Sequence, residues 1–144
     1  MSNKRVGGII VSHGQVATEL LAAAETVVGP QRHIAAVSIG WHDDVEMAKD
    51  EIARAINQVG SGAGVLIMTD MFGGTPTNIS AMFLKPGEVE IVTGVNLPMV
   101  IRFASGAADE MDLAEIAREV EEQGKQAIYR TSALLEPQAH KKDA

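Results

Sequence analysis

The sequence predicts an α/β domain in which helices cover both faces of an open parallel sheet. Short runs that are apolar at every position alternate with stretches whose apolar residues recur at helical spacing. Strands buried on both faces have this continuous apolar character, and alternation with helices favours parallel pairing. The chain has 144 residues, of which 46% are hydrophobic, so it is long enough for one domain with a sizeable core.

The first half of the chain predicts two strand–helix pairs. The first strand spans residues 6–11 and precedes a helix over residues 15–28, which ends at a Gly-Pro pair. The second strand spans residues 34–39 and is followed by an amphipathic helix. The start of that helix resembles a capping box, with Asp43 three positions before Glu46. The apolar stripe of the first helix is expected at Val16, Leu20, Ala24 and Val27.

The second half of the chain predicts two more strands and three helices. The third strand spans residues 64–69 and is apolar throughout. A short helix over residues 75–84 follows, with Thr75 as its N-cap and Pro76 at its first helical position. The fourth strand spans residues 89–93. The remaining predicted elements are a helical piece at residues 98–104, a helix capped by Asp112 and Glu115, and a short closing strand at Ala127–Tyr129.

Composition excludes several classes of function. The chain carries 12 basic and 19 acidic residues, so its net charge of −7 disfavours nucleic acid and anionic membrane surfaces as partners. It has no cysteine, which rules out disulfides, thiolate metal sites and cysteine nucleophiles. No apolar run approaches the ~20 residues of a membrane span, and the start lacks a signal-peptide pattern. We therefore expect a cytoplasmic protein.

Four loops follow the carboxyl ends of the predicted strands, where ligands bind in open α/β sheets. Two of them carry a pair of residues suited to phosphoryl chemistry, His13 after the first strand and Asp70 after the third. A neutral imidazole attacks a phosphoryl group through one ring nitrogen when the other nitrogen holds the proton, and a carboxylate that accepts this proton fixes the tautomer. The plainer alternatives are a histidine that helps to start a helix and an aspartate that forms a turn.

The third loop also predicts an anion site. Gly73 and Gly74 expose backbone amides, and Thr75 opens a helix whose first N–H groups lack internal partners. Such amides can hold phosphoryl oxygens without a metal or a cofactor. The alternative is a flexible turn.

A metal site is the competing interpretation of the second loop. His42, Asp43 and Asp44 have side chains that can bind metal, although helix capping explains both acids at least as well. Because capping is the simpler interpretation, no metal site is expected. A metal-dependent hydrolase that uses His13, Asp70 and His42 is the alternative.

Three stretches resemble the enzyme IIA component of the mannose family of the bacterial sugar phosphotransferase system. They are residues 9–14 (IIVSHG), 69–78 (TDMFGGTPTN) and 93–99 (TGVNLPM). The resemblance implies a mostly parallel sheet with one antiparallel C-terminal strand that is exchanged in a homodimer. It also implies a phosphohistidine at His13 that is oriented by Asp70, with the Gly74–Thr75 segment near the phosphoryl group.

The resemblance further implies the partners. The donor would be the histidine phosphocarrier protein, and the acceptor would be a separate IIB protein reached in trans, with the membrane involved only through a transporter complex. Residues 1–130 would form the single IIA-like domain, and residues 131–144 a mobile polar tail. The alternative is a regulatory protein whose His13 phosphorylation state is read by a partner without onward transfer. The sequence names no sugar.

Overall fold

The computed structural model describes residues 4–40, 44–71 and 73–135. Four strands form one sheet in the order β2-β1-β3-β4, and all neighbouring strands are parallel. The strands are β1 (Gly7–His13), β2 (Ile34–Ile39), β3 (Val65–Thr69) and β4 (Val89–Thr93). The register sets Val11 of β1 beside Val37 of β2 and Thr69 of β3. The predicted parallel sheet is therefore confirmed.

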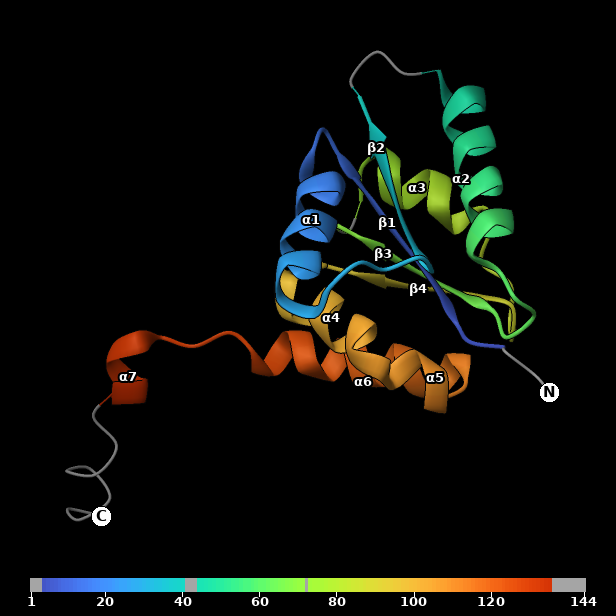
Figure 1. Cartoon of the computed structure of the whole chain (residues 1–144). Helices are drawn as coiled ribbons and strands as arrows, with labels where there is room; N and C mark the ends of the chain where they lie inside the picture. Colours follow the sequence, from blue (N-terminus) through green and yellow to red (C-terminus); the bar gives the residue numbers. More distant parts are fainter. Residues whose placement is uncertain (1–3, 41–43, 72, 136–144) are drawn as a thin grey trace.

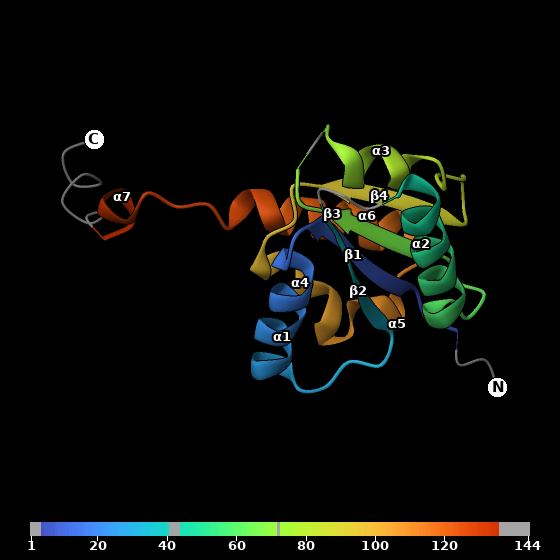
Figure 2. The ribbon, with the colours of Figure 1, turned by 90° about the horizontal axis from the view of Figure 1, so that it is seen from above.

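Helices cover both faces of this sheet, as predicted (Figures 1 and 2). One face carries α2 (Val45–Val59) and α3 (Thr75–Ala81). The other face carries α1 (Val16–Val28), α4 (Leu97–Arg102), the kinked turn η1 (Phe103–Ala107), α5 (Ala108–Glu110) and α6 (Leu113–Gln126). Because both faces are covered, the central strands have no solvent-facing side, which explains their continuous apolar runs.

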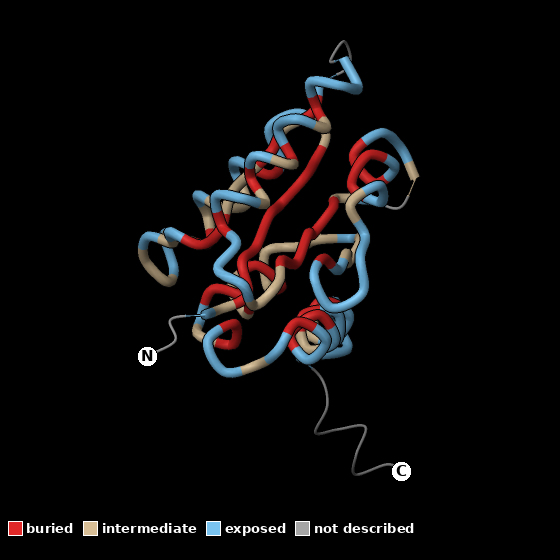
Figure 3. The backbone as a smooth tube through the Cα atoms, turned by 90° about the vertical axis from the view of Figure 1, so that its right-hand side faces the viewer, coloured by how far each residue is buried: buried red, intermediate tan, exposed pale blue. Residues whose placement is uncertain are grey.

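The core consists of two apolar clusters, one on each face of the sheet. Side chains alternate between faces along a strand, so Ile10 of β1 joins the cluster with Phe103, whereas Ile9 and Val11 join the cluster with Ile52 of α2. All five of these side chains are fully buried. Figure 3 shows the same layering, with the buried strands running between helices whose outer sides are exposed.

The predicted apolar stripe of α1 is right at Leu20 and Ala24 and wrong at Val16 and Val27. Val16 and Val27 are 46% and 64% exposed, whereas Ala17 and Ala24 are buried. Leu20, Leu21 and Val28 are partly buried against the same cluster. At both ends of the helix the inward position lies one residue later than predicted, at Ala17 instead of Val16 and at Val28 instead of Val27.

Two predicted helix starts are also corrected. Asp44, not Asp43, is the N-cap of α2, and its carboxylate accepts the N–H of Glu46 at 3.2 Å. Asp43 lies outside the described residues, as do Trp41 and His42 of the same loop. Gly74, not Thr75, is the N-cap of α3, which ends at Ala81 rather than near residue 84.

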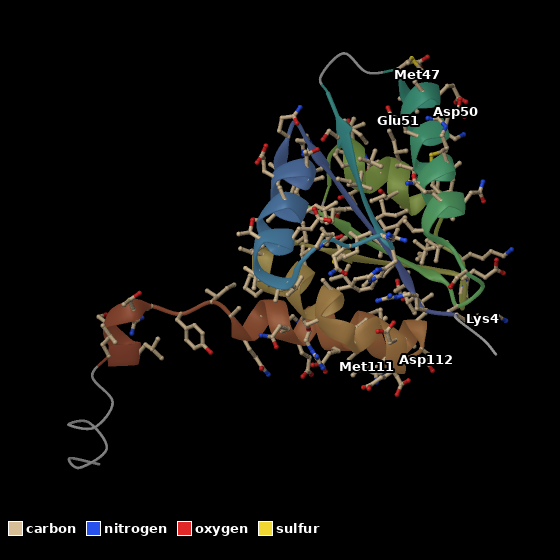
Figure 4. The ribbon with its side chains drawn as sticks, viewed as in Figure 1. Lys4, Met47, Asp50, Glu51, Met111 and Asp112 are labelled. Carbon is tan, nitrogen blue, oxygen red and sulfur yellow. The ribbon has the colours of Figure 1, made fainter. Side chains whose placement is uncertain are left out.

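The capping box of α6 is confirmed. The Asp112 carboxylate accepts the Glu115 N–H at 2.9 Å, and the Glu115 carboxylate accepts the Asp112 N–H at 3.0 Å. Figure 4 labels Asp112 at this start, next to Met111, and labels Met47 and Asp50 on the first turns of α2 at the other end of the molecule.

The C-terminal segment differs from the prediction. Residues 127–129 form no strand in this single chain, and a short helix, α7 (Thr131–Leu135), follows them. Figures 1 and 2 show this segment extending away from the body of the domain. A strand needs a partner for its hydrogen bonds, so the exchanged strand and the homodimer stay predictions. The mobility predicted for residues 131–144 also stays a prediction, and residues 136–144 lie outside the described ranges.

Candidate active site

His13 and Asp70 lie at the carboxyl ends of adjacent strands. The chain leaves β1 through α1 toward β2 on one side, and returns through α2 to β3 on the other side. The gap between the ends of β1 and β3 is therefore a switch point, where open α/β sheets bind their ligands. His13 is the last residue of β1 rather than the residue after the strand, because β1 extends two residues beyond the predicted end.

The two side chains are in direct contact. Nδ1 of His13 lies 2.9 Å from Oδ2 of Asp70, and the backbone N–H of His13 donates to the same oxygen at 2.9 Å. An ionised carboxylate only accepts, so Nδ1 carries the proton and Nε2 has the free lone pair. The His13 side chain is 45% exposed and the Asp70 side chain 16%. Asp70 therefore fixes the orientation of the ring, while the exposed part of the ring remains accessible to a partner protein.

Asp70 is ionised in this arrangement. Burial acts to raise the pKa of its carboxyl group. The hydrogen bonds from the backbone and ring of His13, together with the ring's charge, outweigh burial and leave the pKa below the ordinary 3.8. The carboxylate can thus stabilise positive charge that develops on the imidazole.

The free nitrogen of His13 faces Gly74. A Cβ atom placed on Gly74 would lie 3.3 Å from both Nε2 and Cε1 of the ring, so only glycine leaves this space open. A cavity of about 540 Å³ lies here, lined by His13, Gly14, Gln15, Val16, Ile39, Gly40, Gly74 and Thr75. Of the predicted anion-site residues, Gly74 and Thr75 therefore share a cavity with His13, and Gly73 does not line it.

Two positions of the loop that brings Gly74 to the His13 ring require glycine. Gly73 and Gly74 have φ of +81° and +85°, a region that L side chains rarely adopt. The first intrahelical bond of α3 runs from the Asn78 N–H to the Gly74 carbonyl. The N–H groups before Asn78 have no carbonyl inside the helix to bond, and they are available to acceptors outside it.

Ser12 is a site residue that sequence reasoning missed. Its side chain is fully buried, although it directly precedes the half-exposed His13. The Ser12 Oγ accepts the Ala17 N–H at 2.6 Å and donates to the His13 carbonyl at 3.2 Å. The hydroxyl thus ties the end of β1 to the first turn of α1. The available signal was a polar residue at the end of an apolar strand.

Residues 4–40, 44–71 and 73–135 contain no side-chain cluster that supports the metal-site alternative. No group of three or more His, Cys, Asp or Glu side chains there is arranged to hold a metal ion. The hydrolase alternative also needs His42, which lies outside those ranges. Within the same ranges, no helix combines the length and apolar character that crossing a bilayer requires.

Similarity to known proteins identifies the family. The sequence profile of the EIIA-man family, described as PTS system fructose IIA component, matches residues 7–121. The PTS system sorbose-specific EIIA component of Lacticaseibacillus casei is 33% identical over 100 residues, which cover 69% of this chain and 72% of that protein. The PTS system mannose-specific EIIAB component of Escherichia coli K12 is 25% identical over 126 residues. That match covers 87% of this chain but 39% of the E. coli protein.

The fold is shared with solved structures of the same kind. The mannose/sorbose specific IIA subunit of the phosphotransferase system (PTS) from Enterococcus faecalis superposes with a TM-score of 0.78. It is 28% identical in sequence, and the superposition covers 88% of this chain and 94% of that one. The profile match contains all four strands together with His13 and Asp70. The chain therefore belongs to the EIIA-man family of PTS IIA components.

Proposed function

We propose that this chain is a phosphoryl carrier of a sugar phosphotransferase system. His13 accepts the phosphoryl group from the histidine phosphocarrier protein and passes it to a IIB protein. The observation that carries the proposal is the 2.9 Å contact between His13 Nδ1 and Asp70, which leaves Nε2 free on the cavity side. Membership in the PTS IIA family supports the same general reaction.

The proposed step is an in-line exchange between two imidazoles. The Nε2 lone pair of His13 attacks the phosphorus, the phosphorus–nitrogen bond of the donor breaks, and its electron pair returns to the donor ring. Nδ1 of His13 keeps its proton throughout, and the Asp70 carboxylate steadies the positive charge that grows on the ring. The reverse exchange then delivers the phosphoryl group to the acceptor.

The amides of Gly73, Gly74 and Thr75 are proposed to hold the phosphoryl oxygens. Gly74 and Thr75 line the cavity in front of Nε2, and the start of α3 adds its dipole to the unpaired N–H groups. Gly73 would contribute only through a small change of the loop, because it does not line the cavity. This binding requires neither a metal nor a cofactor.

Phosphoryl transfer can be tested directly. The protein is incubated with phosphorylated histidine phosphocarrier protein, and its mass is measured before and after a chase with candidate IIB proteins. Gain of one phosphoryl group followed by its loss to a IIB protein supports the proposal. A phosphoryl group that is gained but never passed on would instead favour the regulatory alternative, and no gain would exclude both.

We also propose that two copies exchange their C-terminal segments. Ile128 and Tyr129 are adjacent apolar side chains that are 78% and 63% exposed, so a second copy that covered them would bury apolar surface. The edge strand β4 and the end of α6 border a groove of about 370 Å³. An extended segment from a second copy could pair with the edge of β4 as an antiparallel strand, beyond the isolated bridge that Lys85 makes with Val89.

A further inference from the structure

Thr77 is a buried polar residue in the first turn of α3. It is 8% exposed and packs close to Thr69, which is fully buried at the end of β3. A hydroxyl removed from water is destabilising unless it is hydrogen-bonded. The partners of the Thr77 hydroxyl therefore indicate what it stabilises.

Those partners lie immediately before and after Asp70 in the sequence. The Thr77 Oγ1 donates to the backbone carbonyl of Met71 and lies 3.3 Å from the hydroxyl of Thr69. The Thr69 carbonyl is itself fixed by the N–H groups of Gly94 and Val95, at 2.9 and 2.8 Å. One side chain of α3 thus connects the rigid end of β3 with the loop that follows Asp70.

We infer that Thr77 is a positioning residue for the phosphoryl-transfer site, acting through Asp70 on His13. The inference rests on the proposed function. Asp70 must present Oδ2 to both N–H groups of His13, and each contact is 2.9 Å long. Its carboxylate can keep this position only if its own backbone is fixed, and Thr77 restrains the backbone on the loop side. Displacing an orienting group by ~1 Å slows an enzymatic reaction by about 10²-fold.

The inferred positioning of Asp70 depends on the hydroxyl of Thr77 and not on the shape of its side chain. Valine has nearly the same shape as threonine, but it leaves the Met71 carbonyl and the Thr69 hydroxyl without this partner. The loop after Asp70 then relaxes toward other partners, and the carboxylate moves with it. Serine keeps the hydroxyl and loses only a methyl group.

The experiment compares Thr77→Val with Thr77→Ser. The rate of phosphoryl transfer is measured together with the ¹⁵N chemical shifts of the His13 ring. We expect Thr77→Val to slow transfer by about tenfold and to change the ¹⁵N chemical shifts of the ring, because a displaced carboxylate holds the proton on Nδ1 less firmly. Thr77→Ser should keep the transfer rate within about twofold of the wild type and leave the NMR signals of the His13 ring close to those of the wild type.

Ser80 provides a matched control on the same helix. It is fully buried, and its Oγ has no hydrogen-bond partner in the described part of the chain. Ser80→Ala therefore removes a buried hydroxyl of α3 that makes no hydrogen bond to the Asp70 loop, and the ¹⁵N chemical shifts of the His13 ring should not change. A change of similar size in Ser80→Ala would show that any disturbance of α3 reaches the ring, and would overturn the inference.

A double-variant cycle tests the route through Asp70. Adding Thr77→Val to Asp70→Asn should slow transfer no further, because the carboxylate that Thr77 positions is already absent. A folded Thr77→Val with the wild-type rate and ring chemical shifts would overturn the inference, as would additive effects in the cycle. If Thr77→Val does not fold, Thr77→Ala replaces it. The measurement of the ring chemical shifts needs no phosphoryl donor, so it separates failure of this inference from failure of the proposed function.

Discussion

Both the backbone N–H and the ring Nδ1 of His13 contact the same oxygen of Asp70, each at 2.9 Å. One carboxylate oxygen therefore fixes the rotation of the imidazole relative to the strand that carries it. The contact spans 57 positions in the sequence, and the parallel pairing of β1 with β3 makes it possible. It determines the tautomer and the direction of the free nitrogen, and the first predictions follow from it.

The first prediction concerns the proposed nucleophile. Incubation with the phosphorylated donor should give an acid-labile, base-stable phosphoryl group, as expected of a phosphoimidazole. His13→Ala should abolish this label while the fold survives, because a half-exposed side chain at a strand end contributes little to stability. Intact-protein mass and circular dichroism measure the two effects. Full labelling of a folded His13→Ala variant would contradict the proposed role.

The second prediction concerns Asp70. Asp70→Asn keeps the shape of the side chain but removes its charge, and its amide can select the wrong tautomer of the ring. We expect transfer to slow by at least ~10²-fold, because orienting and acid–base groups typically supply ~10²–10⁴-fold. The ¹⁵N chemical shifts of the His13 ring should change, because the carboxylate no longer fixes the tautomer that carries the proton on Nδ1.

The fold is the control for this variant, since asparagine is also a favourable turn residue. Urea unfolding should show a loss that is small compared with the total stability. If neither the transfer rate nor the NMR signals of the His13 ring change, Asp70 only shapes the turn and has no role in transfer. The proposed mechanism would then depend on His13 and the amides of the α3 start alone.

The third prediction separates two neighbouring glycines. Gly74→Ala places a methyl group 3.3 Å from Nε2 of His13, in the space where the phosphoryl group would bind. We expect transfer to fall by at least ~10²-fold, since a displacement of ~1 Å at a reacting group has an effect of this size. Quench-flow measurement of label on the protein gives the rate.

Gly73→Ala is the matched control. Gly73 has nearly the same positive φ as Gly74, but apart from its chain neighbours nothing in the described part of the chain lies within 4 Å of a Cβ placed there. Both alanine variants therefore carry a similar backbone strain, and only one crowds the ring. Gly73→Ala should lose similar stability and keep most of its rate. Equal loss of rate in both variants would attribute the effect to loop strain instead of crowding.

The sequence predicted the strands well because their physical signal is local. Ile34–Ile39 and Val89–Thr93 form strands with the predicted bounds. It also predicted that His13 and Asp70 lie on one edge of the sheet, since both end parallel strands. The direct contact between His13 and Asp70 depends on the strand order, because that order places β1 beside β3. No local pattern encodes this order, although the resemblance to a known family implied the contact.

Other features depend on tertiary packing and were missed. Ala17 of α1 is buried while the more hydrophobic Val16 beside it is half exposed, because the packing of the helix on the sheet, and not hydrophobicity alone, determines which side faces inward. The hydrogen bonds between Ser12 and Ala17 and between Thr77 and Thr69 join residues five and eight positions apart. A buried hydroxyl requires a partner, but the sequence does not show which one.

The fourth prediction concerns assembly. Truncation after Ala127 removes Ile128 and Tyr129, the exposed apolar residues that would pair with a second copy. The full chain should be a dimer at micromolar concentration by light scattering, and the truncated chain should be a monomer or insoluble. Truncation after Arg130 is the control, because it removes α7 and keeps the predicted exchanged strand. A monomeric full chain would contradict the proposed exchange.

The fifth prediction concerns stability at acid pH and depends on His33. The ring is 9% exposed, its Nε2 lies 2.9 Å from Nη2 of Arg5, and it stacks on Phe103. Burial lowers the pKa of His33 below 6.5, Arg5 lowers it further, and Asp109 opposes both. A group whose pKa is depressed on folding stabilises the protein above its unfolded pKa and loses that contribution as the pH falls through the folded value.

The free energy of unfolding should therefore decrease as the pH is lowered from about 8 to about 5, the range in which histidine titrates. His33→Gln cannot titrate, and its side-chain carbonyl can still accept from Arg5. The variant should be less stable at the higher pH, because it loses the ring stacking, but its stability should decline less on acidification. The two proteins differ only at residue 33, so the difference between the pH dependences of their urea-unfolding curves isolates His33. Parallel pH dependence in the two proteins would show that the buried ring does not determine acid stability.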